Sequence, residues 1–290
     1  MDLRRVMIFR SVARAGSISA AARELGWTQP AVSQHLAALE REVGTPLLLR
    51  GPRGVEITEA GRLLLARADT VAGQLHLADE ELAAIAQLRR GSVRLAAYPS
   101  ALATIVPKAV AAVHHRYPDI DVTLVDAEPP EALALLERGD IDLALVFGYD
   151  RSTDLGLGLR RRSVGAEPVH LIVPPTSPYA AGPVSLVDLS GEPWIVGCER
   201  CRSHLLELCR EAGFAPIERH TTDDYVVRQN LVAAGLGVTL LPEAALTAFR
   251  HPGVVVRPDD RFGRRSISIC YRDGADLVPA CAALLGELHP

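Results

Sequence analysis

Residues 16–44, GSISAAARELGWTQPAVSQHLAALEREVG, carry the strongest local pattern in the chain. Gly16 ends a first amphipathic helix, and Ser17 suits the N-cap of a second, short helix that stops at Gly26. Thr28 suits the N-cap of a third helix, in whose first turn a proline is tolerated. The first helix is indicated by Leu3, Val6, Phe9, Val12 and Ala13, which recur at helical spacing. Two short helices joined by a tight turn with glycine describe a helix-turn-helix.

The third helix has two contrasting faces. Val32, Leu36 and Leu39 form an apolar stripe that we expect to point inward. The opposite face presents Gln29, Pro30, Ser33, Gln34, Ala37 and Arg41. Small and amide-bearing side chains suit insertion into the DNA major groove, where glutamine can pair with adenine. A solvated face of a small helical bundle would look the same, and spacing alone does not separate the two interpretations.

Residues 47–58 follow, with two short β-like stretches around a turn that holds arginine and glycine. This pattern predicts a wing, whose tip residue Arg53 can enter a minor groove or hold a phosphate.

A long helix without internal proline comes next, from Thr58 to Leu88. Its apolar residues alternate by four and three, as in a heptad seam. The seam consists of Leu64, Ala68, Val71, Leu75, Ala78, Leu82 and Ile85. A helix with one narrow apolar stripe is marginal alone and stable when paired, so we interpret it as a dimerisation element. Packing against its own domain is the alternative.

Composition excludes several classes of protein. The 290 residues have a net charge of −4, with a slightly basic front and an acidic remainder, which fits DNA contact at one end. No apolar run reaches the ~20 residues of a membrane span, and the N-terminus lacks the pattern of a signal peptide. We therefore expect a cytoplasmic protein without membrane contact. The 5 cysteines, an odd number, argue against a disulfide framework.

The N-terminal pattern resembles the signature of the LysR family of transcriptional regulators. The matching residues are Phe9, Ala13, Gly16-Ser17, Ala21-Ala22, Leu25, Gln29–Ser33, Leu36, Leu39-Glu40, Gly44, Leu47-Leu48, Arg50 and Thr58–Gly61. The resemblance implies that the third helix is the recognition helix and that a dimer of dimers binds a roughly palindromic operator. We predict DNA contacts by Thr28, Gln29, Pro30, Ser33, Gln34, Arg50 and Arg53. Family members often carry arginine at the position of Gln34 and basic residues near Ala37 and Ala38, so fewer phosphate contacts should follow here.

Beyond Gly91-Ser92 predicted strands alternate with predicted helices, which indicates an α/β domain with open, mostly parallel sheets. The strands are expected at 93–97, 120–125, 141–147, 169–173, 194–196, 217–221, 237–241 and 266–271. The helices are expected near 101–116, 129–138, 202–212, 223–235, 242–248 and 276–288.

Three helix starts follow predicted strands, at Pro99-Ser100, Cys198–Ser203 and Thr222-Asp223. Ligands bind at the carboxyl ends of strands in such sheets, and helix N-termini attract anions. Ordinary helix capping explains each start taken singly.

This half also resembles the LysR effector domain, which is similar to periplasmic solute-binding proteins. The matching landmarks are Pro107, Tyr117-Pro118, Leu135, Gly139–Ala144, Glu211–Phe214, Val232–Gly237 and Leu241-Pro242. The resemblance implies two subdomains around a cleft, the first comprising 91–162 plus 266–290 and the second 163–265. On this mapping the effector contacts are Ser100, Ala101, Phe147, Gly148, Arg202, Ser203, Thr222 and Asp223. Arginine can hold a carboxylate bidentately, so a small carboxylate suits Arg202, whereas Asp223 favours a hydroxyl or amine.

The cysteines offer two further hypotheses. Cys198, Cys201 and Cys209 lie at and beyond a helix start, where thiol pKa values fall. Peroxide-sensing members of the family place a redox pair in this region, so a redox sensor using Cys201 and Cys209 is the alternative function. The spacing of this pair does not match cleanly, and a helix holding both would have to unwind. Cys198, Cys201 and His204 lack an adjacent fourth metal ligand, so we expect no metal site.

No catalytic motif is present: there is no Gly-x-Ser-x-Gly, no phosphate loop and no His-Glu-x-x-His. We therefore expect neither an enzyme nor a cofactor. The predicted domains are a winged helix-turn-helix at 1–58, a linker helix at 59–90 and an effector domain at 91–290. The expected partners are double-stranded DNA, a small-molecule effector, further copies of the chain and RNA polymerase.

Overall fold

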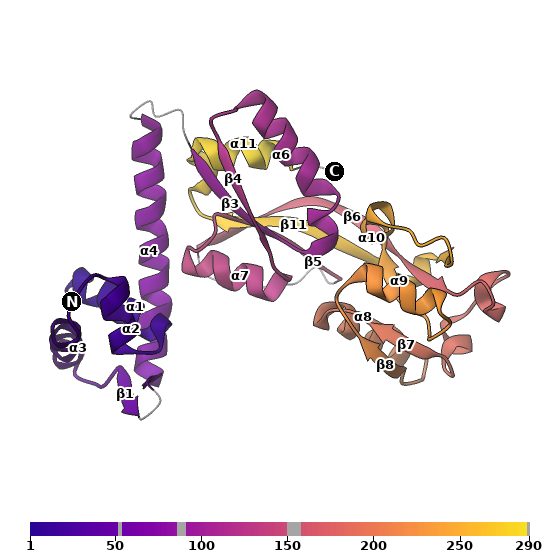
Figure 1. Cartoon of the computed structure of the whole chain (residues 1–290), viewed down its shortest axis with the longest axis horizontal. Coiled ribbons are helices and arrows are strands. Elements are labelled where there is room, and N and C mark those ends of the chain that lie inside the picture. The colour runs from indigo at the N-terminus through magenta and orange to yellow at the C-terminus, as the bar shows by residue number, and fades with distance from the viewer. Residues whose placement is uncertain (52–53, 86–90, 150–157, 289–290) are drawn as a thin grey trace. The chain divides into compact units, whose positions relative to one another are not determined.

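The computed structural model describes residues 1–51, 54–85, 91–149 and 158–288, without the side chains of Arg50 and residues 80–85 (Figure 1). Contacts divide the chain into an N-terminal unit, mainly 1–82, and a C-terminal unit that holds most of 83–290.

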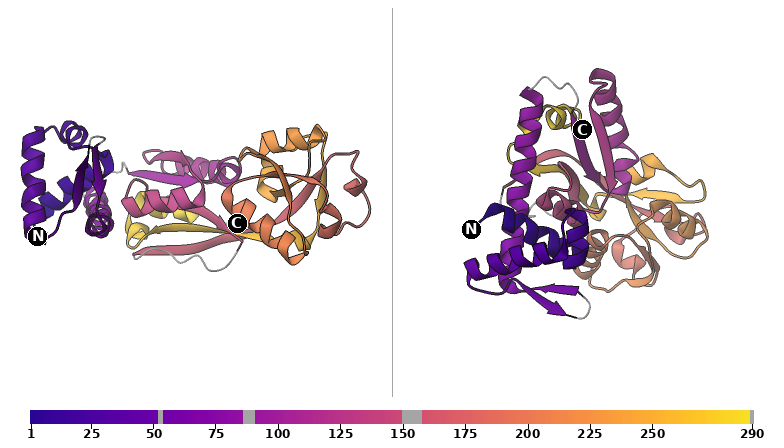
Figure 2. Two further views of the ribbon diagram at one scale, coloured as in Figure 1. Left: turned by 90° about the horizontal axis from the view of Figure 1, so that it is seen from below. Right: turned by 60° about the vertical axis from the view of Figure 1, so that its left-hand side comes forward.

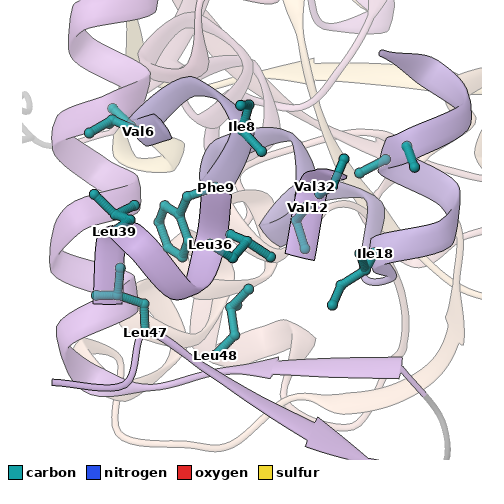
Figure 3. Packing of buried hydrophobic residues seen from close by; sticks show 13 residues of the cluster. Val6, Ile8, Phe9, Val12, Ile18, Val32, Leu36, Leu39, Leu47 and Leu48 are labelled. Carbon is teal, nitrogen blue, oxygen red and sulfur yellow. The ribbon is translucent and has the colours of Figure 1, made fainter. Parts of the chain in front are cut away.

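The N-terminal unit is a three-helix bundle with a β-hairpin and a long helix. Its elements are α1 (Leu3–Ala15), α2 (Ile18–Glu24), α3 (Gln29–Val43), β1 (Leu48–Gly51), β2 (Gly54–Ile57) and α4 (Glu59–Ile85). Phe9 of α1 and Leu36 and Leu39 of α3 meet in its core, as Figure 3 shows. The helix-turn-helix and the inward stripe predicted from the sequence are confirmed.

The two predicted helix caps differ in outcome. The Ser17 hydroxyl accepts from the Ala20 amide at 3.4 Å, so the cap of α2 is confirmed. Thr28 is the N-cap of α3, with an extended backbone, so the predicted position is confirmed, but its side chain makes no capping hydrogen bond. Pro30 occupies the second position of α3 and has no amide hydrogen to offer, which removes one of the donors that a cap residue uses.

The predicted wing is confirmed as the antiparallel pair β1–β2, from Leu48 opposite Ile57 to Gly51 opposite Gly54. Gly54 has φ +127°, and a Cβ there would lie 2.4 Å from the Gly16 carbonyl oxygen. The wing therefore approaches the end of α1 more closely than any side chain allows. The tip, including Arg53, lies outside the described residues.

The predicted long helix after the wing is confirmed as α4. Its apolar seam has two parts, one packed against the three-helix bundle and one exposed. Leu64 and Ala68 pack against the core of the three-helix bundle. Further along, Val71 and Leu75 are exposed. In a straight helix, residues at a strict heptad spacing rotate about 20° around the helix axis per heptad. The two ends of the seam therefore face different directions. The side chains of Leu82 and Ile85 lie outside the description.

The C-terminal unit consists of two lobes joined by long strands (Figures 1 and 2). The first lobe contains β3 (Ser92–Ala97), α5 (Pro99–Leu102), α6 (Ile105–Arg116), β4 (Asp121–Asp126), α7 (Pro129–Arg138), β5 (Leu143–Gly148) and α11 (Pro279–Glu287). The second lobe contains β7 (Pro193–Val196), α8 (Glu199–Glu211), β8 (Ile217–Thr221), α9 (Tyr225–Ala233), β9 (Thr239–Pro242), α10 (Glu243–Ala248) and β10 (Val255–Pro258). Each lobe has its own apolar cluster.

Two antiparallel strands, β6 (Leu159–Val173) and β11 (Arg264–Arg272), run through both lobes. Strand β11 pairs with β5 in the first lobe, and β6 pairs with β9 and β10 in the second. Their register shifts between Ile267 and Ser268, which marks a bulge where the strands pass from one lobe to the other. The predicted two-lobed α/β fold is confirmed.

Mostly parallel sheets were predicted, and this is wrong. The main sheet has the order β10-β6-β11-β5-β3-β4, and every pairing of β6 and β11 is antiparallel. The parallel pairings are β3–β4, β3–β5 and β7–β8. The sequence did not reveal β10, a strand of 4 residues, or the first half of β6. In β6, three consecutive arginines, a glycine and a proline resemble a loop.

Candidate functional site

The outer face of α3 is polar and mostly uncharged. Gln29, Pro30 and Gln34 are exposed and Ser33 is half-buried, on the side opposite the buried stripe. Thr28, just before the helix, is also exposed. The structure thus places five of the seven predicted DNA contacts at one end of one helix. Of the other two, Arg50 lies on β1 without a described side chain, and Arg53 is outside the described residues.

Trp27, just before α3, contacts side chains of α1 and α3. Trp27, in the turn before α3, lies 5.3 Å from the His35 ring, and the Arg4 guanidinium lies 4.8 Å from the Trp27 ring. Because no cap side chain accepts from the first-turn amides, these donors and the positive end of the helix are available to an anion. Such an arrangement suits a phosphate of the DNA backbone.

A half-open cavity with a volume of about 30 Å³ lies between the two lobes of the C-terminal unit. This is room for one or two water molecules. Tyr98, Phe147 and Arg265 line it from the crossing strand and the first lobe, and Cys201 and Arg228 line it from the second lobe. The lining therefore holds two arginines together with two carboxyl groups, those of Glu128 and Asp223.

Arg265 is a buried cation held by a carboxylate, a hydroxyl and two aromatic rings. Its Nε donates to Glu167 Oε1 at 2.6 Å and its Nη2 to the Ser100 hydroxyl at 2.7 Å. Its guanidinium also lies 4.7 Å from the Tyr98 ring and 4.5 Å from the Phe147 ring. Although burial opposes it, the negative groups nearby raise the pKa of Arg265 above its usual range. This arginine is held in place by the protein itself.

Arg228 of α9 is buried differently. Its Nε and Nη2 donate to the Thr239 hydroxyl at 3.2 and 2.6 Å, and Nη2 also donates to the Leu240 carbonyl at 2.6 Å. These oxygens are uncharged, so the bonds do not neutralise the cation. Nη1 lies against Gly197, where a Cβ would come within 2.5 Å of it. Glycine at that position lets the guanidinium reach the cavity.

Two cysteines lie at the start of α8, with Cys198 as its N-cap. The Cys198 thiol donates to Cys201 Sγ at 2.9 Å, and the Tyr149 hydroxyl reaches the same sulfur at 3.7 Å. The hydrogen bond from Cys198 lowers the pKa of Cys201 to about 6; burial acts against it, and Arg228 and Arg265 lower it further. The same contact raises the pKa of Cys198 well above its usual range.

The Tyr149 ring stacks on the His204 ring with centroids 3.8 Å apart, and burial raises the pKa of Tyr149. Glu128 lines the cavity as well, with Oε2 buried and without a hydrogen-bond partner. Burial and the negative charge of Cys201 raise the pKa of Glu128 to about 7.

The predicted effector residues divide into two groups. Ser100, Phe147 and Asp223 line the cavity together. Ala101 is buried and Gly148 lines a smaller neighbouring cavity with Arg161 and Arg200. Ser203 is exposed on α8, and the Thr222 hydroxyl accepts from the Asp224 amide at 3.3 Å. Arg202 is exposed, and both arms of its guanidinium bind Glu218, at 2.6 and 2.7 Å.

The polar and aromatic cavity residues that the sequence reasoning missed include Tyr98, Glu128, Arg228 and Arg265. The strand position of Arg265 carries a usable signal, since in the pair Arg264-Arg265 alternation turns one side chain inward. Arg228, within an ordinary helical pattern, gives none. The helix start predicted at Thr222-Asp223 is also shifted, because Asp224 caps α9 and accepts from Val226 and Val227.

Comparison with known proteins covers both units. The family model described as "Bacterial regulatory helix-turn-helix protein, lysR family" matches residues 3–62, and "LysR substrate binding domain" matches residues 86–290. The chain belongs to the LysR family of transcriptional regulators. Such a regulator binds DNA and has an effector-binding domain, and the family consists of regulators rather than enzymes.

Individual relatives agree with this assignment. This LysR-type regulator is 30% identical to the DNA-binding transcriptional dual regulator OxyR of Escherichia coli K12, over 86% of this chain and 82% of that protein. It is 28% identical to the transcriptional dual regulator GltC of Bacillus subtilis, over 97% of this chain and 94% of that protein.

Two solved structures show the same fold. Full-length OxyR from Pseudomonas aeruginosa, in a variant form, superimposes with a TM-score of 0.74 at 20% identity, over 99% of this chain and 94% of that one. Full-length CbnR in complex with its target DNA gives a TM-score of 0.64 at 23% identity, over 99% of each chain.

Within the described residues of this regulator, no cluster of three or more His, Cys, Asp or Glu side chains could hold a metal ion. No helix in the described part of the chain is long and apolar enough to cross a membrane.

Proposed function

We propose that the exposed end of α3 reads operator bases through Gln29, Ser33 and Gln34, while Thr28 and Pro30 fit against the DNA backbone. The wing residues Arg50 and Arg53 add phosphate or minor-groove contacts. The observation that carries this proposal is the exposure of a polar, uncharged face at a helix start whose amides have no side-chain cap. Domains at 1–58, 59–90 and 91–290 divide the work between DNA reading, pairing and effector binding.

Selection of binding sites from random DNA, followed by base-by-base substitution, tests the reading face. Gln29→Ala and Gln34→Ala should each relax preference at one or two base pairs, by about 1–3 kcal/mol per bidentate contact. Gln74→Ala, an exposed glutamine on α4, is the matched control and should leave specificity unchanged. Equal effects of all three substitutions would contradict the assignment.

Self-association through α4 follows from its exposed apolar residues. Val71 and Leu75 are 39% and 47% exposed, and nearby Leu63 is 67% exposed. A surface of this kind is stabilised by a second copy, so the chain forms a dimer, and two dimers form the operator-binding tetramer in the cytoplasm. In sedimentation experiments Leu75→Glu should shift the protein towards the monomer, and an unchanged mass would contradict this interface.

The effector is a small anion, such as a carboxylate, bound by Arg228 in the cavity between the lobes. Arg228 supports this because its hydrogen bonds to the protein all run to uncharged oxygens and its side chain lines the cavity. Arg202, in contrast, already has a carboxylate partner in Glu218. Since the cavity holds only one or two waters, the lobes must part to admit the effector, and this movement couples binding to the DNA-bound assembly.

Thermal-shift screening with small mono- and dicarboxylates tests the effector class. Arg228→Met should abolish the ligand-induced rise in melting temperature, whereas Arg202→Met should retain it. If Arg202→Met abolished the rise in melting temperature and Arg228→Met retained it, Arg202 would be the anion-binding residue. A response of both variants would exclude an arginine-held anion.

A further inference from the structure

We propose that Cys198 and Cys201 form a reversible disulfide inside the cavity when a small hydroperoxide enters it. This oxidation site goes beyond anion binding and uses a different pair from the Cys201–Cys209 pair considered from the sequence. The contact between Cys198 and Cys201 and their shared position on the cavity wall carry the proposal.

The two sulfurs are already in contact at 2.9 Å. A disulfide bond is about 2.05 Å long, so the sulfurs need to approach by less than about 1 Å. Cys198 is the N-cap, with an extended backbone at φ −54° and ψ 163°, and is therefore not bound to helical geometry. No unwinding of α8 is needed.

Cys209 does not offer this geometry. It is fully buried in the apolar cluster of the second lobe, beside Leu205 and Trp194. Burial raises the pKa of Cys209 to about 11, so its thiol stays protonated at neutral pH. A thiol in that state is a poor nucleophile.

Cys201 is the attacking group. Its pKa of about 6, set first by the hydrogen bond from Cys198, leaves it mainly as thiolate at neutral pH. Its position at the start of α8 adds the positive end of the helix. The titratable and charged groups that face it from the surrounding elements are Glu128, Tyr149, Cys198, His204, Asp223, Arg228 and Arg265.

The narrow inner part of the cavity favours a small oxidant over a bulky one. Its volume of about 30 Å³ admits a molecule the size of one or two waters, which hydrogen peroxide matches. The Cys201 thiolate attacks one peroxide oxygen, the O–O bond breaks, and the departing hydroxide takes a proton from the solvent to leave as water. This step leaves Cys201 as a sulfenic acid.

Cys198 completes the reaction. Its sulfur attacks the Cys201 sulfur, the S–O bond breaks, and a second water departs, so the two thiols supply two electrons to the peroxide. Glu128 lies within hydrogen-bond reach of the Cys198 thiol and, with a pKa of about 7, can take its proton and pass it to the departing hydroxide. A thiol reductant returns the disulfide to two thiols by exchange.

Formation of the disulfide changes the charge next to Arg228 and Arg265. Reduced Cys201 places a negative charge beside Arg228 and Arg265 and accepts from Tyr149, which follows β5 of the first lobe. Oxidation removes both the charge and the acceptor. Oxidised protein should therefore bind an anionic effector more tightly and hold its lobes together less firmly.

The test is a thiol count on the full-length protein. Reduced protein is freed of reductant, exposed to hydrogen peroxide at pH 7, alkylated and digested with trypsin. The 5 free thiols should fall to three. Trypsin cuts after Arg200, between the two cysteines, so the disulfide appears as two joined peptides. The Cys209→Ser variant should give the same joined peptides.

Two variants separate the steps. Cys198→Ser should stop at a Cys201 sulfenic acid that dimedone traps, and Cys201→Ser should react with peroxide at least tenfold more slowly. A wild-type count that stays at five, or a bond from Cys201 to Cys209, would overturn the proposal. The count needs neither DNA nor effector, so its failure would leave the proposed function untouched, and the reverse also holds.

Discussion

Glu167→Ala should reveal how much the buried cation of the cavity depends on its one carboxylate. Glu167 accepts from Arg265 Nε at 2.6 Å and from the Ala244 amide at 2.6 Å. The side chains of Arg265 and Glu167 are only 3% and 11% exposed. Removal of one partner from a buried pair leaves an uncompensated charge, which typically costs about 3–5 kcal/mol.

The matched comparison is the double variant Arg265→Met/Glu167→Met, which fills a similar volume without charge. It leaves the Ser100 hydroxyl and the Ala244 amide without partners but removes the buried charge, so its cost should be smaller than that of Glu167→Ala. Both costs are measured by urea unfolding in the full-length chain.

Trp194 reports on this part of the molecule, since it is fully buried in the second lobe. A Trp27→Phe background removes the tryptophan of the N-terminal unit, so that fluorescence follows the C-terminal unit alone. A loss below about 1 kcal/mol for Glu167→Ala would refute the reasoning. A double variant as unstable as the single one would also refute it.

Three further substitutions test other parts of the structure. Gly54→Ala places a Cβ 2.4 Å from a backbone oxygen at φ +127°, so it should cost about 1–3 kcal/mol in thermal denaturation, whereas Gly51→Ala meets open space and should cost much less. Asp69→Ala removes a half-shielded 2.6 Å ion pair with Arg10 between α4 and α1, and should lower the free energy of unfolding by about 1–3 kcal/mol. Glu128 has a folded pKa of about 7 against 4.5 normally, so its stabilising effect is complete below pH 4.5 and is lost as the pH rises through 7. Glu128→Gln should therefore flatten the fall in melting temperature over that interval, and an unchanged profile would show that another group titrates.

The sequence predicts the N-terminal unit well because its signals are local. The stripe of Val32, Leu36 and Leu39 lies on one helix, and the Gly16-Ser17 turn is set by the residues that form it. Helix spacing and turn chemistry depend on neighbours a few positions away. The wing follows for the same reason.

The cavity was less predictable because its contacts are remote in sequence. Arg265 binds Ser100, 165 positions away, and nothing in either neighbourhood marks the pair. The family resemblance implies Arg202 as a carboxylate contact, but its side chain binds Glu218 on the surface, and the sequence does not mark that partner. The mixed sheet was missed because the pairings of β6 and β11 span about a hundred positions.

DNase footprinting on the DNA that flanks the protein's own gene tests the central claim most directly. The account predicts protection of a two-fold-symmetric site. Arg53→Ala should weaken that protection on every sequence, Gln29→Ala should weaken it selectively, and Gln74→Ala should leave it intact. Absence of protection at low salt, where DNA binding is strongest, would contradict the account.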